Sequence, residues 1–245
     1  MKRRAVMAGI IICLGFGTAW SKIHRIRKVG EYPNFLALSL DGRMAYVTSS
    51  GTGDLIAVDL AQKSIAGSVQ VGDAPLGIAL ADNGKTAFVA CRDSGTVAVV
   101  DLASLRVEAN IKVSGSPIAV AISPKGYRAF VTNFGRTKDG TLHIIDVRER
   151  TVTSTIKMGM APIAVAVSPI NDSVYVANGG SNDVWVVNPG RQAVVARIPV
   201  GEAPDGIAIS PDGKKVFVSN SRSDDLSVID AQLNKVLVTV PGLKK

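Results

Sequence analysis

The sequence predicts an all-β fold, a β-propeller built from five repeats of about 42 residues. A proline recurs at steps of 42, 42, 45 and 42 residues, and an aspartate or asparagine keeps the same spacing. The prolines are Pro33, Pro75, Pro117, Pro162 and Pro204, and the second marker is Asp59, Asp101, Asp146, Asn188 and Asp230. The composition agrees, because 47% hydrophobic but only 5% aromatic residues leave a core of Val, Ile, Leu and Ala, and the β-branched residues favour strands.

The last repeat shows each expected element in order. Residues 206–210 form a short apolar strand, and Pro211-Asp212-Gly213 is a turn in which glycine accepts a positive φ. Residues 216–218, 226–230 and 236–240 are three further strands. Four short antiparallel strands joined by tight turns are typical of a propeller blade. A horseshoe of helical repeats is excluded, because no repeat contains a helical period of ten or more residues.

The repeats make up a single domain of residues 22–245. They span residues 29–70, 71–112, 113–157, 158–199 and 200–241. An alanine recurs in the first strand of each repeat, as expected for an innermost strand that crowds around the axis. These alanines are Ala37, Ala79, Ala121, Ala166 and Ala208. An isolated repeat cannot bury both of its faces, so we expect the repeats to be stable only when packed on one another.

The second strand of every repeat carries a short motif. It reads Tyr46-Val47-Thr48-Ser49, Phe88-Val89-Ala90-Cys91, Phe130-Val131-Thr132-Asn133, Tyr175-Val176-Ala177-Asn178 and Phe217-Val218-Ser219-Asn220. Together with the S-P-D-G and V-I-D elements, this pattern resembles the YVTN family of β-propeller repeats over residues 22–241. The resemblance implies an exported or cell-surface propeller, similar also to the seven-bladed lactonase and surface-layer propellers. This sequence departs from that pattern in having five repeats.

The ends of the repeat array leave closure of the ring open. Residues 23–29 match a fourth strand plus its joint, so six candidate outer strands accompany five sets of inner strands. We favour a closed five-bladed ring over an open arc of a larger propeller. An open arc would expose two apolar blade faces and would favour a homodimer.

The N-terminus predicts export. Lys2, Arg3 and Arg4 precede an apolar run of residues 5–19, and small residues follow, which is the layout of a signal peptide over residues 1–21. The alternative is an uncleaved anchor, but the run of about 15 residues is short for a span of about 20. We therefore expect a periplasmic, secreted or cell-surface protein that meets the membrane only through this segment. Cys91 is the only cysteine outside it, so no internal disulfide forms.

The charge gives no strong indication of a nucleic-acid partner. Without residues 1–21 the chain has 28 − 3 = 25 Lys and Arg against 20 Asp and Glu, a net charge of +5. This mild excess and the scarcity of aromatic residues offer little surface for phosphates and stacked bases. A nucleic-acid-binding propeller is kept as an alternative.

Two groups of residues are candidate ligand sites. The 45-residue step places three extra residues in the loop of residues 133–140, where Phe134, Arg136 and Lys138 could hold an anionic or planar ligand. A drifted hairpin is the alternative. The second group is Asn34, Glu202 and Asp205, which we expect near the mouth of a central tunnel.

Catalytic signals are few. Only His24 and His143 are present, and no G-x-S-x-G, phosphate-binding or C-x-x-C motif occurs. The repeated aspartates and the asparagines of the second-strand motif are interpreted as turn caps, because residues that recur in every repeat are structural. We predict no catalytic residue, metal site or cofactor. The favoured function is an exported, non-catalytic binding scaffold for a protein or small ligand. The alternative is a lactonase-like hydrolase or lyase with its site at the tunnel mouth.

Overall fold

The computed structural model describes residues 26, 29–134 and 139–242 and contains twenty strands in five four-stranded antiparallel sheets. Each sheet is one blade, and its strands pair in the order in which they follow in the sequence. The predicted all-β propeller of five four-stranded repeats is confirmed. The predicted signal peptide of residues 1–21 lies outside the described residues, and no described helix is long and apolar enough to cross a membrane.

The strands have the following bounds. Blade 1 contains β1 Pro33–Leu38, β2 Met44–Ser49, β3 Asp54–Asp59 and β4 Ser64–Gln70. Blade 2 contains β5 Pro75–Ala81, the 3₁₀ turn η1 Asp82–Gly84, β6 Thr86–Cys91, β7 Thr96–Asp101 and β8 Arg106–Lys112. Blade 3 contains β9 Ser116–Ile122, β10 Arg128–Phe134, β11 Thr141–Asp146 and β12 Thr151–Lys157. Blade 4 contains β13 Pro162–Val167, β14 Val174–Asn178, β15 Asp183–Asn188 and β16 Ala193–Pro199. Blade 5 contains β17 Pro204–Ile209, β18 Lys215–Asn220, β19 Asp225–Asp230 and β20 Lys235–Pro241.

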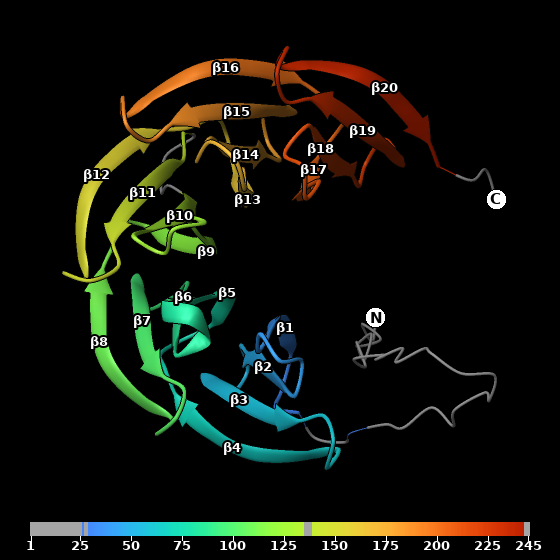
Figure 1. The fold of residues 1–245 in the computed structure, drawn as a ribbon. Coiled ribbons are helices and arrows are strands. Elements are labelled where there is room, and N and C mark those ends of the chain that lie inside the picture. Colours follow the sequence, from blue (N-terminus) through green and yellow to red (C-terminus); the bar gives the residue numbers. More distant parts are fainter. Residues whose placement is uncertain (1–25, 27–28, 135–138, 243–245) are drawn as a thin grey trace, which may run out of the picture.

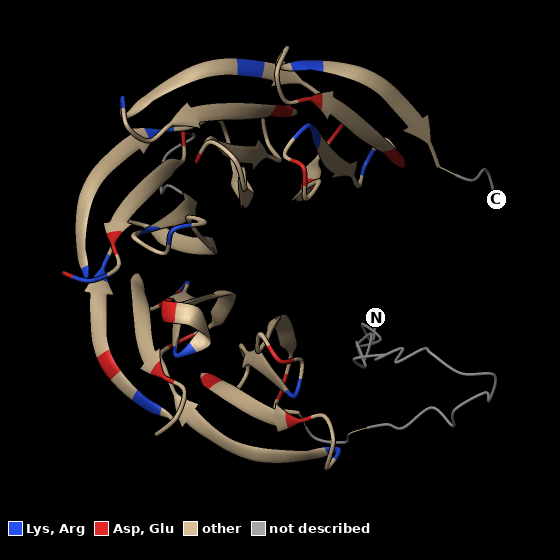
Figure 2. Ribbon diagram, in the orientation of Figure 1, with Lys and Arg blue, Asp and Glu red and all other residues tan. Residues whose placement is uncertain are grey.

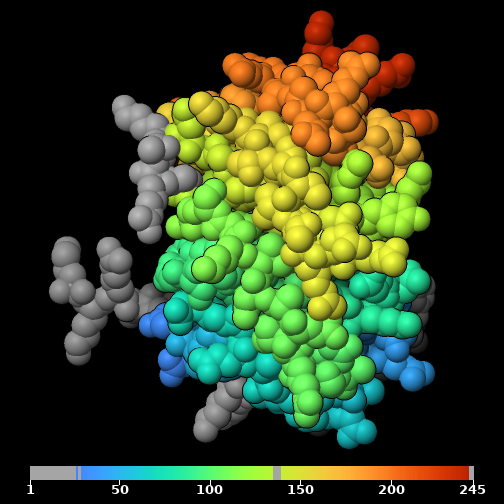
Figure 3. Space-filling model, turned by 90° about the vertical axis from the view of Figure 1, so that its left-hand side faces the viewer, coloured from blue at the N-terminus to red at the C-terminus, as the bar shows by residue number. Residues whose placement is uncertain are grey.

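The blades follow one another around an arc, with the first strand of each blade inside and the fourth strand on the rim (Figure 1). Blades 1 and 5 stand on either side of an opening (Figure 1). Viewed onto the rim, the middle blades form an unbroken surface (Figure 3). The closed ring favoured from the sequence stays a prediction.

Each blade has two apolar faces, because successive side chains of a strand point to opposite sides of its sheet. We call the face toward the preceding blade the leading face and the face toward the next blade the trailing face. In β2, Tyr46 belongs to the cluster shared with blade 2, whereas its neighbour Val47 belongs to a separate cluster on the leading face. Charged residues lie mostly at strand ends and turns (Figure 2). The core is therefore a series of layers between blades rather than one central mass.

The repeated aspartates cap turns, as predicted from their repetition. An Oδ1 atom of Asp59 accepts from the backbone N–H of Gln62 at 2.7 Å, and Asp101 accepts from Ser104 N–H at 2.7 Å. Asp146 does the same for its own turn. The equivalent turn of blade 4 is capped by the amide of Asn188 and that of blade 5 by Asp230, so one side chain of this kind holds the turn between the third and fourth strands in every blade.

The motif asparagines do something other than the predicted capping. Asn178 and Asn220 are buried, and their Nδ2 groups donate to the carboxylates of Asp183 and Asp225 at 2.9 and 2.6 Å. The joint glycines of these two blades pack on the asparagines, since a Cβ at Gly159 would lie 2.9 Å from Asn178 and one at Gly201 would lie 2.7 Å from Asn220. The sequence could not show this, because the bond joins the ends of two strands rather than one turn.

The inner strands of blades 2 and 3 touch at a glycine. A Cβ on Gly77 of β5 would lie 2.6 Å from Ala119 Cα and 2.7 Å from Ile118 O, which are backbone atoms of β9 and cannot rotate away. The inner strands of these two blades therefore approach each other at backbone level. The five inner-strand alanines that were expected to be crowded are not buried: four are half-buried and Ala208 is exposed.

We predict that Gly77→Ala lowers the free energy of unfolding by about 1–3 kcal/mol, the usual cost of forcing a methyl into a packed interior. The matched control is Gly190→Ala, where the new Cβ would meet only Asn188 Oδ1 at 3.4 Å. Urea unfolding of both variants measures the difference. Equal stability of the two variants would contradict the close approach of β5 and β9.

Candidate functional site

The joints between blades and the loops between second and third strands share one face, which we call the loop face. Backbone hydrogen bonds tie them together: Ser50 N–H donates to Tyr32 O at 3.1 Å, and Arg92 N–H donates to Ala74 O at 3.0 Å. The same pattern recurs in the last two blades. The joints and these loops therefore lie together on one side of the arc.

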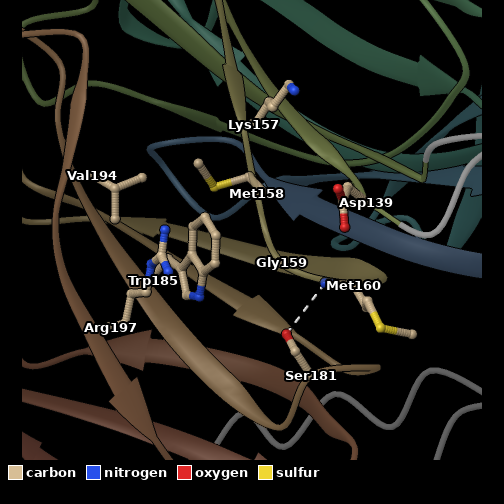
Figure 4. Close-up of a pocket in the computed structure, with 9 residues that line it drawn as sticks. All are labelled: Asp139, Lys157, Met158, Gly159, Met160, Ser181, Trp185, Val194 and Arg197. Atoms are coloured by element: carbon tan, nitrogen blue, oxygen red, sulfur yellow. Dashed lines mark hydrogen bonds between the residues drawn. The ribbon is translucent and has the colours of Figure 1, made fainter.

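A groove of about 380 Å³ opens between blades 3 and 4 (Figure 4). Blade 3 contributes the end of β12 and the residue that follows the three-residue insertion, and blade 4 contributes its joint, β15 and β16. The lining residues are Asp139, Lys157, Met158, Gly159, Met160, Ser181, Trp185, Val194 and Arg197. The volume lies within the range of small-molecule sites, about 300–1,000 Å³.

The Trp185 ring is held by a hydrogen bond at its edge and by a cation–π contact on its face. Its Nε1–H donates to Asp183 Oδ2 at 2.9 Å, and the Arg197 guanidinium carbon lies 4.0 Å from the ring centroid. Trp185 and Arg197 are register partners on β15 and β16, so the hairpin itself places the cation over the ring. Such stacking contributes about 0.5–1 kcal/mol at a partly exposed site.

Asp183 connects the tryptophan to the loop face. Its other carboxylate oxygen accepts from Asn178 Nδ2 at 2.9 Å and from Ser181 Oγ at 2.8 Å. Ser181 Oγ in turn accepts from Met160 N–H at 3.2 Å (Figure 4). The Asp183 carboxylate therefore fixes the Trp185 indole and the end of β14 directly, and it fixes the joint through Ser181.

The groove combines an apolar floor with a charged rim. Met158 is buried, and Val194 and Trp185 are half-buried, whereas Lys157 and Asp139 are exposed. In Figure 4, Arg197 and Asp139 lie on opposite sides of Met158 and Trp185. Among the described residues, neither Lys157 nor Arg197 forms an ion pair. Within this part of the chain, Lys157 therefore has no carboxylate partner, and Arg197 is held on the Trp185 ring without one.

His143 occupies in blade 3 the position of Trp185 in blade 4. It is buried, its Nδ1 lies 2.9 Å from Thr155 Oγ1, and its Nε2 lies 3.0 Å from Asn133 Nδ2. Burial lowers the pKa of His143 below its usual value, and the Ser114 backbone partly opposes this shift. It is a neutral core residue at near-neutral pH rather than part of the groove.

The residues of the first sequence-based candidate group lie beside this groove. Phe134 ends β10 with 46% of its surface exposed, and Arg136 and Lys138 lie outside the described residues. Asp139, which follows them, lines the groove. The loop with the length irregularity therefore borders this groove, whereas Trp185 and Arg197 were not among the sequence-based candidates, and the role of Phe134, Arg136 and Lys138 stays a prediction. Pairing residues across the hairpin turn at 189–192 would have brought these two together.

The second candidate group is divided between the ends of the arc. Asn34 belongs to blade 1, where its Nδ2 donates to Tyr32 O and to Ser50 Oγ at 2.8 and 2.7 Å. Asp205 belongs to blade 5 and accepts from Ser219 Oγ at 2.8 Å, and Glu202 lies in the preceding joint. These blades stand on either side of the opening (Figure 1), so the structure does not bring Asn34 to the two acids. Within the described residues, no cluster of three or more His, Cys, Asp or Glu side chains could hold a metal ion.

Comparison with known proteins supports the fold. A family description, the YNCE-like beta-propeller, matches residues 152–245, which is less than half of the chain. Hydrazine synthase of Kuenenia stuttgartiensis superposes with a TM-score of 0.77 at 20% identity, over 86% of this chain and 74% of that one. The dihydro-heme d1 dehydrogenase NirN, solved in complex with DHE, gives a TM-score of 0.67 at 23% identity, over 85% of this chain but 46% of that one. No curated protein matches. At these identities the structures show a shared β-propeller fold.

We predict that His143 makes the fold sensitive to acid. Its pKa is lowered in the folded state and is about 6.5 in the unfolded chain, so the unfolded state binds the proton first as the pH falls. Stability is therefore lost progressively below about pH 6.5 until the folded-state pKa is passed. Thermal unfolding between pH 8 and pH 5, compared with His143→Gln, measures this effect. An equally steep acid loss in His143→Gln would refute the assignment.

We predict that Asp183→Asn releases Trp185, because an amide cannot accept all three of the hydrogen bonds that the carboxylate accepts. We expect a loss of about 1.5–3 kcal/mol in stability, the usual value for bonds to a charged group, and a red shift of tryptophan emission. Trp20→Phe in all variants leaves Trp185 as the only tryptophan. The control is Asp225→Asn, which removes the charge from the equivalent bond to Asn220 but leaves the indole untouched. A red shift in both variants would contradict the prediction.

Proposed function

We propose that this chain is an exported, non-catalytic binding propeller of the YVTN type that holds a small organic anion in the groove between blades 3 and 4. The observation that carries the proposal is Trp185, held by Asp183 and covered by Arg197, with Lys157 on the same groove. The YVTN assignment rests on the five second-strand motifs, and export rests on the sequence of residues 1–21.

The groove favours a ligand with a flat apolar part and a carboxylate. Trp185, Met158 and Val194 supply apolar and polarisable surface for the flat part, and thioethers adapt to irregular shapes. The two cations supply charge-assisted hydrogen bonds to an anionic group, which are stronger than neutral ones. A neutral ligand of the same shape would contact only the apolar floor and would lack the bonds to the two cations.

The groove also depends on few parts of the molecule. All its lining residues come from residues 139–197, so blades 3 and 4 with their joint are sufficient to build it. A ligand at this position needs neither a closed ring nor a central tunnel. This separates the proposal from the lactonase-like alternative, which requires residues at a tunnel mouth.

Calorimetric titration with 2-naphthoate and with its neutral analogue 2-naphthamide tests the proposal. We expect 2-naphthoate to bind more tightly, and Lys157→Gln or Arg197→Gln to weaken it about five- to tenfold, as for partly exposed charge pairs of about 1 kcal/mol. Neither substitution should change binding of the amide by more than a small factor.

The matched control is Lys112→Gln. Lys112 ends β8 at the repeat position of Lys157 and lines the corresponding groove between blades 2 and 3, which has no tryptophan. We expect it to leave 2-naphthoate binding unchanged. Equal affinity for acid and amide, or an equal loss in Lys112→Gln, would overturn the proposal.

A further inference from the structure

The trailing face of blade 5 is apolar and exposed. By the register of the sheet, one side of this blade carries Ala208, Phe217, Leu226, Val228, Val238 and Val240. Val238 and Val240 on β20 are 51% and 46% exposed, and Phe217 and Leu226 are partly exposed. Contiguous apolar surface of this kind marks an interaction site on a soluble protein.

The other blades show what this face is built for. Phe217 corresponds by repeat position to Tyr46, Phe88, Phe130 and Tyr175, all of which are buried against the next blade. Val240 corresponds to Ile198, which is 2% exposed, and to Ile156 and Ile111, which are also buried. Terminal repeats that end in solvent carry a polar outer face. Blade 5 instead keeps the residues of a blade that has a neighbour.

The leading face of blade 1, at the other end of the arc, is partly covered by the chain itself. Its central residues Val47 and Ile56 are buried, with Ile26 and Val29 packed against them. Its edges are exposed, at Leu36 and Leu38 on the inner strand and at Ile65 on the outer strand. The chain itself therefore covers the middle of this end of the arc, whereas no described residue beyond Gly242 packs on the trailing face of blade 5.

We propose that the trailing face of blade 5 binds the same face of a second copy of this chain across a two-fold axis parallel to the axis of the arc. In this arrangement β17 of one copy lies against β20 of the other, and β18 lies against β19. Two-fold contacts that use one patch twice are the commonest in homo-oligomers.

The residues of the face fit this symmetry. Its inner strand β17 carries the small residues Gly206 and Ala208, and its outer strand β20 carries the larger Val238 and Val240. The two-fold axis places the small residues of β17 in one copy against the larger residues of β20 in the other. The gap between the two faces is therefore filled evenly from β17 to β20. It also sets Lys215 of each copy opposite Asp230 of the other, because these register partners lie on β18 and β19. The charges at the edge are therefore complementary.

The shape of the arc disfavours a head-to-tail contact with blade 1 of a second copy. The arc occupies more than half of a circle (Figure 1), so a second arc that continued the same ring would collide with blade 1. With the two-fold axis, the two arcs curve away from each other. A blade face of about 20 by 20 Å gives about 800 Å² over the two copies, below the usual size of a specific interface, so the dimer should be weak and should dissociate on dilution.

Sedimentation velocity of the full chain over a range of concentrations tests the proposal. We expect a monomer–dimer equilibrium that Val238→Lys weakens at least about tenfold, because two unpaired ammonium groups would be buried. The control is Leu38→Lys, at a position 53% exposed on blade 1, which should leave the equilibrium unchanged. Residues 1–25 are the same in every variant, so association through them would not distinguish the two. Unchanged melting temperatures show that both variants fold.

Cysteine pairing gives a second measurement. Ala208→Cys and Val238→Cys in one chain lie three strand spacings apart, about 14 Å, beyond the reach of a disulfide within the copy. Across the two-fold axis they meet, so oxidation should give a covalent dimer. Cys13→Ser removes the terminal thiol, and burial raises the pKa of Cys91 to about 12, so it stays unreactive.

Three results would overturn the proposal. One is a monomer at every concentration, and another is a dimer that Val238→Lys does not weaken. The third is a Leu38→Lys variant that is also monomeric alone but forms a one-to-one pair when mixed with Val238→Lys, which would show a head-to-tail contact. A covalent dimer from the double cysteine variant supports the two-fold arrangement directly.

Discussion

A four-stranded blade with two apolar faces cannot be stable alone, and the rest of this structure depends on that constraint. Every strand alternates its side chains between the preceding and the following blade, so each blade completes the core of both neighbours. The buried aromatic ring of the second strand, Phe88 or Phe130 for example, faces the next blade in each of the first four repeats. Within a blade such as blade 2, the second and third strands are therefore buried on both faces, and the fourth strand on the rim is largely exposed.

The same constraint explains how far the sequence could be interpreted. Residues that serve the blade recur every 42 or 45 residues, so the strands, the turn-capping aspartates such as Asp59 and the shared loop face were all predictable. The role of the motif asparagines was not. Asn178 bonds to Asp183 across two strand ends, and a repeat pattern shows that a residue is structural without showing its partner.

The groove escaped prediction because the two residues that distinguish it, Trp185 and Arg197, do not recur in the other blades. Position 185 holds tryptophan, whereas the equivalent in blade 3 is His143, which bonds to Asn133 and Thr155 and is buried. A position that changes from one blade to the next gives no pattern, and its importance depends on a cross-strand neighbour, Arg197, twelve residues away. The three-residue insertion gave the only sequence signal near this site, and part of that loop lies outside the described residues.

The number of blades matters differently for the two kinds of site that a propeller can offer. A tunnel-mouth site needs residues from many blades to converge, and here Asn34 and Asp205 belong to the two ends of an arc. A groove between neighbouring blades needs only that these two blades pack against each other. The contact between blades 3 and 4 lies far from both ends, and its cluster of Phe130, Leu142 and Met158 is almost fully buried. Association at blade 5 would therefore leave the groove unchanged, because none of its lining residues belongs to that blade.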